Sequence, residues 1–308
     1  MHLYMYHRLR SKEAPLSRFK ESMKLYTMKR LLVCTDLSEA SDHLLKAAEE
    51  LVSINGGAID LLYVSELGLH LSPQADEKKD ATFRDVILSE YKQTIDSKFS
   101  QQLNRCSSRA KMIFREGKVY EEVIGVAQEG QHDLIIMGHA EKSLVMHVLG
   151  SNALKVVSAA PIPLLVVKNR LHLGKIAGLV DESREMERII IGAFDFYRIF
   201  KFSEIEFVSL WMDFPYPFKN HLEKSEAETK LKDEVDYYAD PKDHVVVKLE
   251  STKELKLAKH LLEILIRDKI DLVVLKRFSE GNLKRVYLGS TTKRLLESFE
   301  GNFLILPP

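Results

Sequence analysis

The chain has 308 residues, of which 45% are hydrophobic, and its 45 basic side chains balance 45 acidic ones. This length suits two ordinary domains, and this hydrophobic content is enough for a packed core in each half. A balanced charge argues against a dedicated nucleic-acid-binding protein, which usually carries a basic excess. We therefore expect a globular protein without a nucleic-acid partner.

Residues 1–27 differ from the rest of the chain because they are basic, rich in Met and without an uninterrupted apolar core. This pattern does not fit a signal peptide. We interpret residues 1–27 as an N-terminal extension. It is either a loose segment or the product of an upstream start codon, with true initiation at Met23 or Met28. The alternative is a short amphipathic arm that docks on the first domain.

Two further observations bear on the compartment. No apolar run reaches the roughly 18 residues that a membrane helix needs, so no membrane partner is expected. Cys34 and Cys106 have neither zinc-ligand nor CxxC spacing, which favours two buried apolar residues in a reducing environment. The expected location is the cytoplasm.

The first half alternates between short apolar runs and helical patterns. Arg30–Cys34 is typical of a buried parallel strand, and the following helix begins near Ser38 or Ser41 and ends at Gly56. Further strands are predicted at 59–64, 112–114, 134–137 and 164–167, and further helices at 83–103, 119–127 and 151–158. This alternation predicts a doubly wound, five-stranded parallel sheet with its ligand site at the carboxyl ends of the strands.

The second half repeats anchors of the first in the same order and at nearly constant separation. Asp133-Leu-Ile-Ile-Met137 matches Asp271-Leu-Val-Val-Leu275, Gly150-Ser151 matches Gly289-Ser290, and Leu164–Val167 matches Phe303–Leu306. With Ile189 taken as the start of its first strand and Trp211 as the end of its second, this half lacks room for a full first helix. The predicted domains are 28–168 and 187–308, joined by a linker at 169–186.

The general catalytic motifs are absent: there is no Walker A loop, G-x-G-x-x-G, G-x-S-x-G or H-E-x-x-H. His139 and His147 lack metal-ligand spacing. What remains is the glycine-bearing stretch from Met137 to Asn152, where backbone N–H groups and a helix N-terminus would suit a phosphate. Asp36 ends the first strand at the same sheet edge and would accept from ribose hydroxyls.

These segments resemble the universal stress protein family. The glycine loop resembles that family's G-x2-G-x9-G-[ST] pattern, and the stretches that resemble its first strand, third-helix entry and last strand are Val33–Glu39, Arg115–Glu122 and Pro161–Val167. The resemblance covers 29–168 well and 187–308 more weakly. It implies two tandem flavodoxin-like domains, dimerisation through the last strand, stress-related regulation, and adenine-nucleotide binding in some members.

Carried over residue by residue, the resemblance gives a nucleotide site for ATP or AMP in the first domain. Thr35 and Asp36 would meet base and ribose, Val64 would pack on adenine, Met137 and Gly138 would lie under the ribose and first phosphate, and Gly150, Ser151 and Asn152 would hold the phosphates. The loop departs from the family's pattern because it is one residue shorter and has Glu141 in place of the middle glycine, or Ala140 under another alignment.

Other interpretations of the same residues stay open. Gly138 alone would suit a tight turn, Gly150-Ser151 a helix start, and Asp36 a helix cap. In the second domain Lys276 and Ser279 take the glycine positions, and Phe194 stands opposite Asp36, so no nucleotide site is predicted there. A basic run, Lys276, Arg277, Lys284 and Arg285, is typical of a solvated face.

Three functions compete. The first is a regulatory protein that binds an adenine nucleotide in domain 1. The second is a nucleotide-free interaction module, in which Leu164–Val167 and Phe303–Leu306 pair within the chain, with a homodimer as the alternative assembly. The third is a slow ATPase, ranked last because no general base or metal pair is evident beyond Asp36; an enzyme is therefore not expected.

Overall fold

The computed structural model describes residues 28–38, 41–66, 79–104, 110–138, 151–181, 186–212, 223–252, 256–279, 286–287 and 289–308. The extension at 1–27, the second cysteine and the loop at 139–150 lie outside these residues. The chain divides into two compact units. One comprises Met28–His172 with Leu275–Pro308, and the other contains Leu173–Val274.

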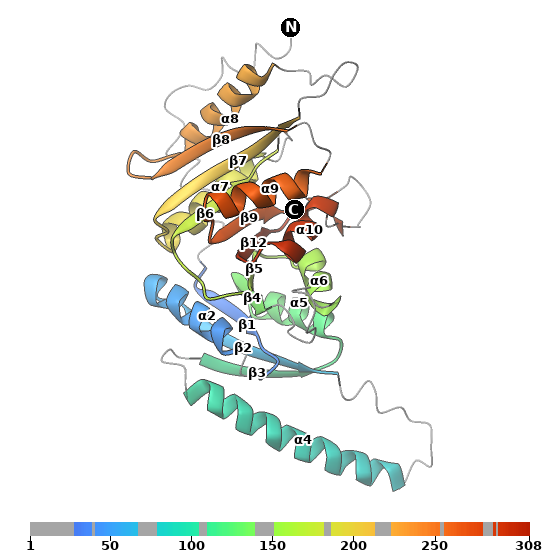
Figure 1. Ribbon diagram of the computed structural model, residues 1–308. Coiled ribbons are helices and arrows are strands. Elements are labelled where there is room, and N and C mark those ends of the chain that lie inside the picture. The colour runs from blue at the N-terminus through green and yellow to red at the C-terminus, as the bar shows by residue number, and fades with distance from the viewer. Residues whose placement is uncertain are drawn as a thin grey trace. The chain divides into compact units, whose positions relative to one another are not determined.

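The first unit is built on the sheet order β3-β2-β1-β4-β5-β12 (Figure 1). Its first five strands are parallel, and β12 joins β5 antiparallel. The switch of strand order therefore lies between β1 and β4, where such sheets place ligands. The strands are β1(Arg30–Cys34), β2(Ala58–Ser65), β3(Ala110–Glu116), β4(Leu134–Gly138), β5(Leu164–Val167) and β12(Asn302–Leu306). The predicted doubly wound α/β sheet is confirmed. Its parallel strands follow the order 3-2-1-4-5, whereas those of flavodoxin follow the order 2-1-3-4-5.

Helices connect these strands as the periodicity predicts. The first, α2(Asp42–Asn55), ends where Gly56 takes φ +73° and donates its N–H to Val52 O at 2.8 Å. Glycine suits this left-handed position because it has no Cβ. The other helices of the unit are α4(Lys79–Asn104), α5(Val119–Glu129), α6(Ser151–Ala159) and α10(Ser290–Ser298), with a short hairpin of β10(Phe278–Ser279) and β11(Val286–Tyr287).

The second unit contains a parallel sheet in the order β9-β6-β7-β8. Its strands are β6(Lys175–Leu179), β7(Glu204–Met212), β8(Val245–Thr252) and β9(Leu272–Lys276), and its helices are α7(Met186–Ile199), α8(Lys224–Tyr238) and α9(Leu257–Arg267). Strand and helix therefore alternate here in the same order as in the first unit.

Two predictions for this half are wrong. A strand, β6, lies inside the predicted linker 169–186, and the first helix is not reduced, since α7 has 14 residues. The helix includes Ile189, which was predicted to begin a strand. Apolar residues on most sides of α7 are buried, including Ile190 and Phe196, and a helix buried all round gives an apolar run that periodicity cannot distinguish from a strand.

Two aspartates have the same structural role in the two units. Asp133 accepts the N–H groups of Lys29 and Arg30 through Oδ2, at 2.8 and 3.0 Å, and donates its own N–H to Arg30 O. Asp271 accepts the Lys175 N–H at 2.8 Å and donates its N–H to Lys175 O. The matching sequence anchors thus tie the start of β1 to β4 and the start of β6 to β9.

The predicted pairing of the two last strands is confirmed. Phe303 lies opposite Val166, and Ile305 lies opposite Leu164. All eight side chains of Leu164–Val167 and Phe303–Leu306 are buried. Because each strand covers the other's edge, neither is left as an open apolar edge on this side.

Two buried cations fasten this strand pair. Lys168 follows β5 and donates from Nζ to Phe299 O, at the C-terminal end of α10, at 2.8 Å. Arg277 follows β9 and donates from Nη2 to Ala160 O, just beyond α6. Each cation thus meets the negative end of a helix dipole. The expectation of a solvated face is wrong for Lys276 and Arg277, which are 4% and 3% exposed; Lys284 and Arg285 lie outside the described residues.

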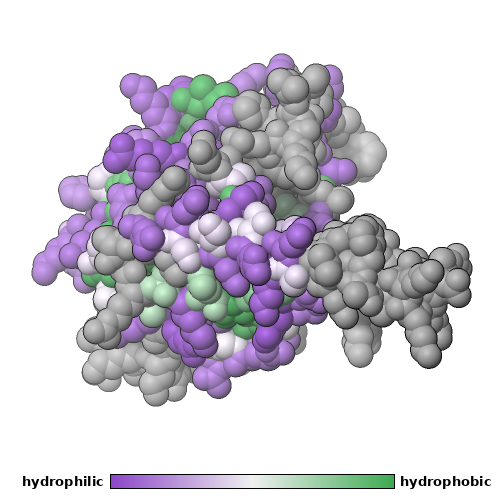
Figure 2. Space-filling model, turned by 90° about the horizontal axis from the view of Figure 1, so that it is seen from below, coloured by the Kyte–Doolittle hydropathy of each residue, from purple (hydrophilic) through white to green (hydrophobic). Residues whose placement is uncertain are grey.

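The remaining exposed surface is mixed. The face drawn in Figure 2 is mostly hydrophilic where it is coloured, with apolar residues in small separate groups. Met112 and Ile266 are the large apolar side chains that stand exposed among the described residues, at 39% and 63%. No helix within the described ranges is long and apolar enough to cross a membrane.

Candidate functional site

The candidate site lies at the carboxyl edge of the first unit's sheet. Cys34 is in register with Leu62 of β2 and Met137 of β4, so the residues that follow these three strands meet at one edge. This places Asp36 beyond the end of β1 and Gly138 at the end of β4, beside Val167 of β5. The structure therefore brings together the ends of β1 and β4, as the sequence predicted.

The Asp36 carboxylate is exposed but ordered by its own loop. Its Oδ1 accepts three hydrogen bonds, from the Ser38 N–H at 2.9 Å, the Ser38 hydroxyl at 2.6 Å and the Ser41 hydroxyl at 2.5 Å. Partial burial alone would raise the pKa of this carboxyl, but the hydrogen bonds from Ser38 and Ser41 outweigh it and lower the pKa. Asp36 is thus a fixed anion near neutral pH, and all three donors use the same oxygen.

Thr35 is turned inward rather than toward solvent. The residue is 8% exposed. Its hydroxyl donates to Gln102 Oε1 of α4 at 3.2 Å and accepts the Leu37 N–H at 2.9 Å, while its backbone N–H donates to Leu62 O. The Thr35 hydroxyl is therefore engaged by α4 and by the loop itself, and the Thr35 N–H by β2. No local sequence pattern points to Gln102, because it lies 67 positions from Thr35.

The remaining predicted residues line the same edge to different degrees. Val64 is half-buried near the end of β2, and Met137 is 7% exposed in β4. A Cβ added to Gly138 would lie 3.4 Å from the Leu44 side chain, so α2 packs closely over this position. Asn152 is half-buried in the first turn of α6, which Ser151 begins. Gly150, together with His139, Glu141, Lys142 and His147, lies outside the described residues.

Sequence reasoning missed a counterpart of Asp36 in the second unit. Asp181 follows β6 at the distance at which Asp36 follows β1, and Lys175-Ile-Ala-Gly-Leu-Val-Asp181 aligns with Arg30-Leu-Leu-Val-Cys-Thr-Asp36. The Val180 N–H donates to Val208 O at 2.9 Å, as the Thr35 N–H donates to Leu62 O. The earlier assignment of Phe194 to this position is wrong, because Phe194 lies in α7.

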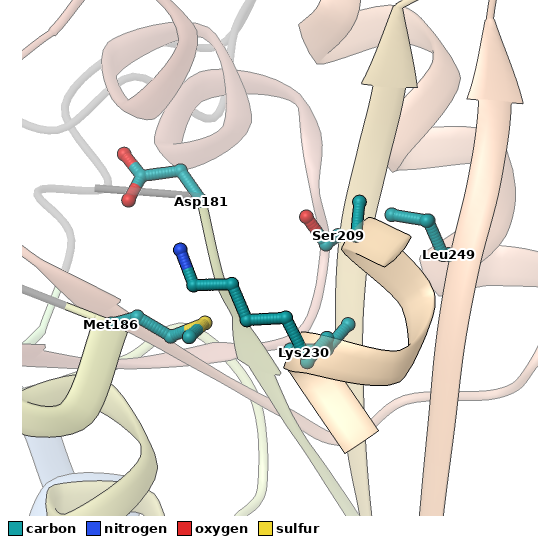
Figure 3. Close-up of a pocket in the computed structure, with 7 residues that line it drawn as sticks. Asp181, Met186, Ser209, Lys230 and Leu249 are labelled. Atoms are coloured by element: carbon teal, nitrogen blue, oxygen red, sulfur yellow. The ribbon is translucent and has the colours of Figure 1, made fainter. Parts of the chain in front are cut away.

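A small pocket is lined in part by Asp181 (Figure 3). It is lined by side chains from the end of β6, the start of α7, β7, β8 and α8: Asp181, Met186, Ser209, Ala227, Lys230, Leu231 and Leu249. In Figure 3 the Lys230 ammonium points toward the Asp181 carboxylate. Asp181 therefore shares its pocket with a lysine side chain, whereas the Asp36 carboxylate accepts two hydroxyl groups and a backbone N–H.

Within the part of the chain that the structure describes, no group of three or more His, Cys, Asp or Glu side chains could hold a metal ion. Burial raises the pKa of the Cys34 thiol to about 12, so the reactive thiolate is disfavoured.

Solved structures share the fold over nearly the whole chain. A universal stress protein from Archaeoglobus fulgidus DSM 4304 matches with a TM-score of 0.68 and 18% identity, covering 91% of this chain and 98% of that one. A protein of unknown function from Pseudomonas aeruginosa PAO1 matches with a TM-score of 0.62 and 17% identity, covering 94% and 95%. At these identities the likeness concerns the fold.

Sequence relatives match the first half. Residues 27–168 fit the universal stress protein family. Universal stress protein G of Escherichia coli O157:H7 is 34% identical over 134 residues, which cover 42% of this chain and 90% of that protein. Universal stress protein G of Salmonella typhimurium is 32% identical over 133 residues, again 42% and 90%. Because it is 34% identical to Universal stress protein G of Escherichia coli O157:H7 over 90% of that protein, the chain belongs to the universal stress protein family.

Proposed function

We propose that this protein is a stress-related regulator with two tandem universal-stress-protein domains, the first of which binds an adenine nucleotide, AMP or ATP, without a defined catalytic reaction. The observation that carries the proposal is the Asp36 carboxylate. It is exposed at the carboxyl edge of β1, and its donors Ser38 and Ser41 engage Oδ1 alone. Oδ2 is the oxygen that would accept the ribose hydroxyls.

The neighbouring residues supply what the rest of a nucleotide requires. Val64 offers partly exposed apolar surface near the end of β2, and Met137 lies buried near the end of β4. The phosphates would lie at the N-terminus of α6, which begins at Ser151, because a helix N-terminus presents free N–H groups and partial positive charge. Gly150 would let the backbone approach the ligand, while the missing side chain at Gly138 makes room for Leu44 of α2.

The first domain is favoured over the second for this role. Lys230 and Asp181 line one pocket, with the Lys230 ammonium pointing toward the Asp181 carboxylate, so a lysine side chain lies where a ribose would need space. Val180 takes the place of Thr35 and has no hydroxyl to brace its loop. Lys276, a buried side chain, ends β9 where Gly138 ends β4 in the first domain. These differences support one nucleotide per chain.

The direct test is mass spectrometry of small molecules released from the purified, denatured protein, followed by titration calorimetry with ATP and AMP. We expect Asp36→Asn to weaken nucleotide binding by about 10–100-fold, because the amide preserves an oxygen for Ser38 and Ser41 but replaces the acceptor Oδ2 with a donor. The matched change Asp181→Asn should leave the affinity unchanged. Equal affinities for Asp36→Asn and the parent protein would refute the site.

A second candidate, a nucleotide-free interaction module, is favoured by the paired last strands. Because β5 and β12 cover each other and are fastened by Lys168 and Arg277, the edge that would join two chains is occupied within one chain. Absence of any released nucleotide, together with a monomer in analytical ultracentrifugation, would support this module; a homodimer would need another surface. Release of phosphate from ATP would instead support the slow ATPase.

A further inference from the structure

Gln102 is a buried polar side chain of α4 that contacts the loop carrying Asp36. It is 4% exposed near the C-terminal end of α4. Its Oε1 accepts the Thr35 hydroxyl at 3.2 Å, and its Nε2 donates to Ser38 O at 3.3 Å. One amide group therefore bridges the two ends of the loop Thr35–Ser38, with Asp36 between them.

This loop needs external support because its backbone is unusual. Leu37 has φ +61°, in the left-handed region that residues with a Cβ seldom adopt, and it is 7% exposed. The Thr35 hydroxyl accepts the Leu37 N–H and donates to Gln102. The conformation of Leu37 is thus coupled through one hydroxyl to a side chain of α4.

The helix that carries Gln102 is itself anchored on the same sheet. Ile95 and Phe99 lie on the Gln102 side of α4 and are 3% and 1% exposed. The Tyr91 hydroxyl lies 2.5 Å from the Tyr63 hydroxyl of β2, and the Tyr63 ring meets Phe99 edge to face at 6.2 Å. Tyr91, Ile95, Phe99 and Gln102 follow helical spacing, so they form one packing face.

We propose that Gln102 is the positioning residue of the candidate nucleotide site: it holds Thr35 and Ser38 so that the Asp36 carboxylate keeps its orientation. The inference rests on the proposed function. It applies to the first domain alone, because Val180, the counterpart of Thr35, has no hydroxyl to donate.

The test uses the full chain and ATP as the probe in titration calorimetry. Gln102→Leu keeps the approximate size of the side chain but removes both hydrogen bonds, and it should weaken ATP binding at least tenfold. Gln101→Leu, the neighbouring exposed glutamine, is the matched control and should bind as the parent does. Because Gln102 acts through Asp36, Gln102→Leu combined with Asp36→Asn should bind no more weakly than Asp36→Asn alone.

A second measurement does not depend on nucleotide. In Gln102→Leu the Leu37 and Ser38 amides should exchange with solvent at least tenfold faster than in the parent, while those of β1 stay protected. If the parent binds ATP and Gln102→Leu binds it equally well, the positioning role is wrong. Unchanged Leu37 and Ser38 exchange also refutes it. If the parent binds no nucleotide, the proposed function fails, and the exchange result alone decides whether Gln102 orders the loop.

Discussion

Replacing Val166 with Asp is expected to destabilise the first unit by about 3–5 kcal/mol, because the new carboxylate would be buried without a partner. Val166 is fully buried in β5 and lies opposite Phe303 of β12, which is also fully buried. A charge at this position cannot reach water while the strand pair is intact. Urea unfolding followed by circular dichroism measures the change in the free energy of unfolding.

The control places the same residue in another strand of the same sheet. Met112 lies in the edge strand β3 and is 39% exposed, so Met112→Asp should cost about 1 kcal/mol or less. If Val166→Asp and Met112→Asp unfold at the same urea concentration, the pairing of β5 with β12 contributes little to stability. The proposal of a self-contained interaction module would then lose its main support.

The elements of the first unit follow from local pattern. Strands such as Leu134–Gly138 are short apolar runs between amphipathic helices, and Gly56 marks a helix end through its left-handed backbone. Pairing of the two last strands also follows, since an apolar edge in each copy needs a cover. These features depend on periodicity and on the chemistry of single residues, both of which the sequence carries directly.

Sequence pattern alone could not distinguish β6, the first strand of the second unit, from a linker. β6 contains Gly178 and follows Gly174, and glycines resemble loop signals. Packing accounts for both: a Cβ at Gly174 would lie 2.3 Å from Asp271 Oδ2, and one at Gly178 would lie 2.9 Å from the Phe207 ring. The signal that identifies β6 is its alignment with Arg30–Asp36, which requires the repeat to be extended upstream of Ile189.

The sequence predicts the position of a site residue only where that position follows from the end of a strand. The position of Asp36 beyond β1 follows from sheet topology. The inward turn of Thr35 and the bridge from Gln102 depend on contacts between residues more than 60 positions apart. Burial of Arg277 likewise depends on the carbonyl of Ala160, 117 positions away. No local pattern encodes such partners.

The Lys168 ammonium is expected to lose its proton near pH 8. Burial beside the Phe303 ring lowers the pKa of Lys168 from 10.5 to about 8, although Glu297 and Glu300 act in the opposite direction. In the folded protein, Nζ donates to Phe299 O. Selective labelling of lysine with nitrogen-15 and NMR titration should show one ammonium that titrates more than one pH unit below the others.

The same shift predicts how stability depends on pH. Below pH 8 Lys168 is charged in both states, so the folded state carries the full penalty of burying the charge. Between about pH 8 and 10 the unfolded chain binds more protons than the folded one, so this residue makes stability rise with pH by up to about 1.4 kcal/mol per unit. The difference in the free energy of unfolding between the parent protein and Lys168→Met isolates this contribution, because other titrating groups cancel.

Lys168→Arg provides the matched control because arginine stays protonated over this range. The parent protein should gain stability relative to Lys168→Arg as well as to Lys168→Met between pH 8 and 10, while the two variants should differ by a constant amount. If the parent and Lys168→Met instead keep a constant difference from pH 7 to 10, Lys168 titrates in the folded protein as it does in the unfolded chain. The ammonium would then be solvated rather than buried at the end of α10, and the fastening of β5 to β12 would rest on Arg277 and apolar packing.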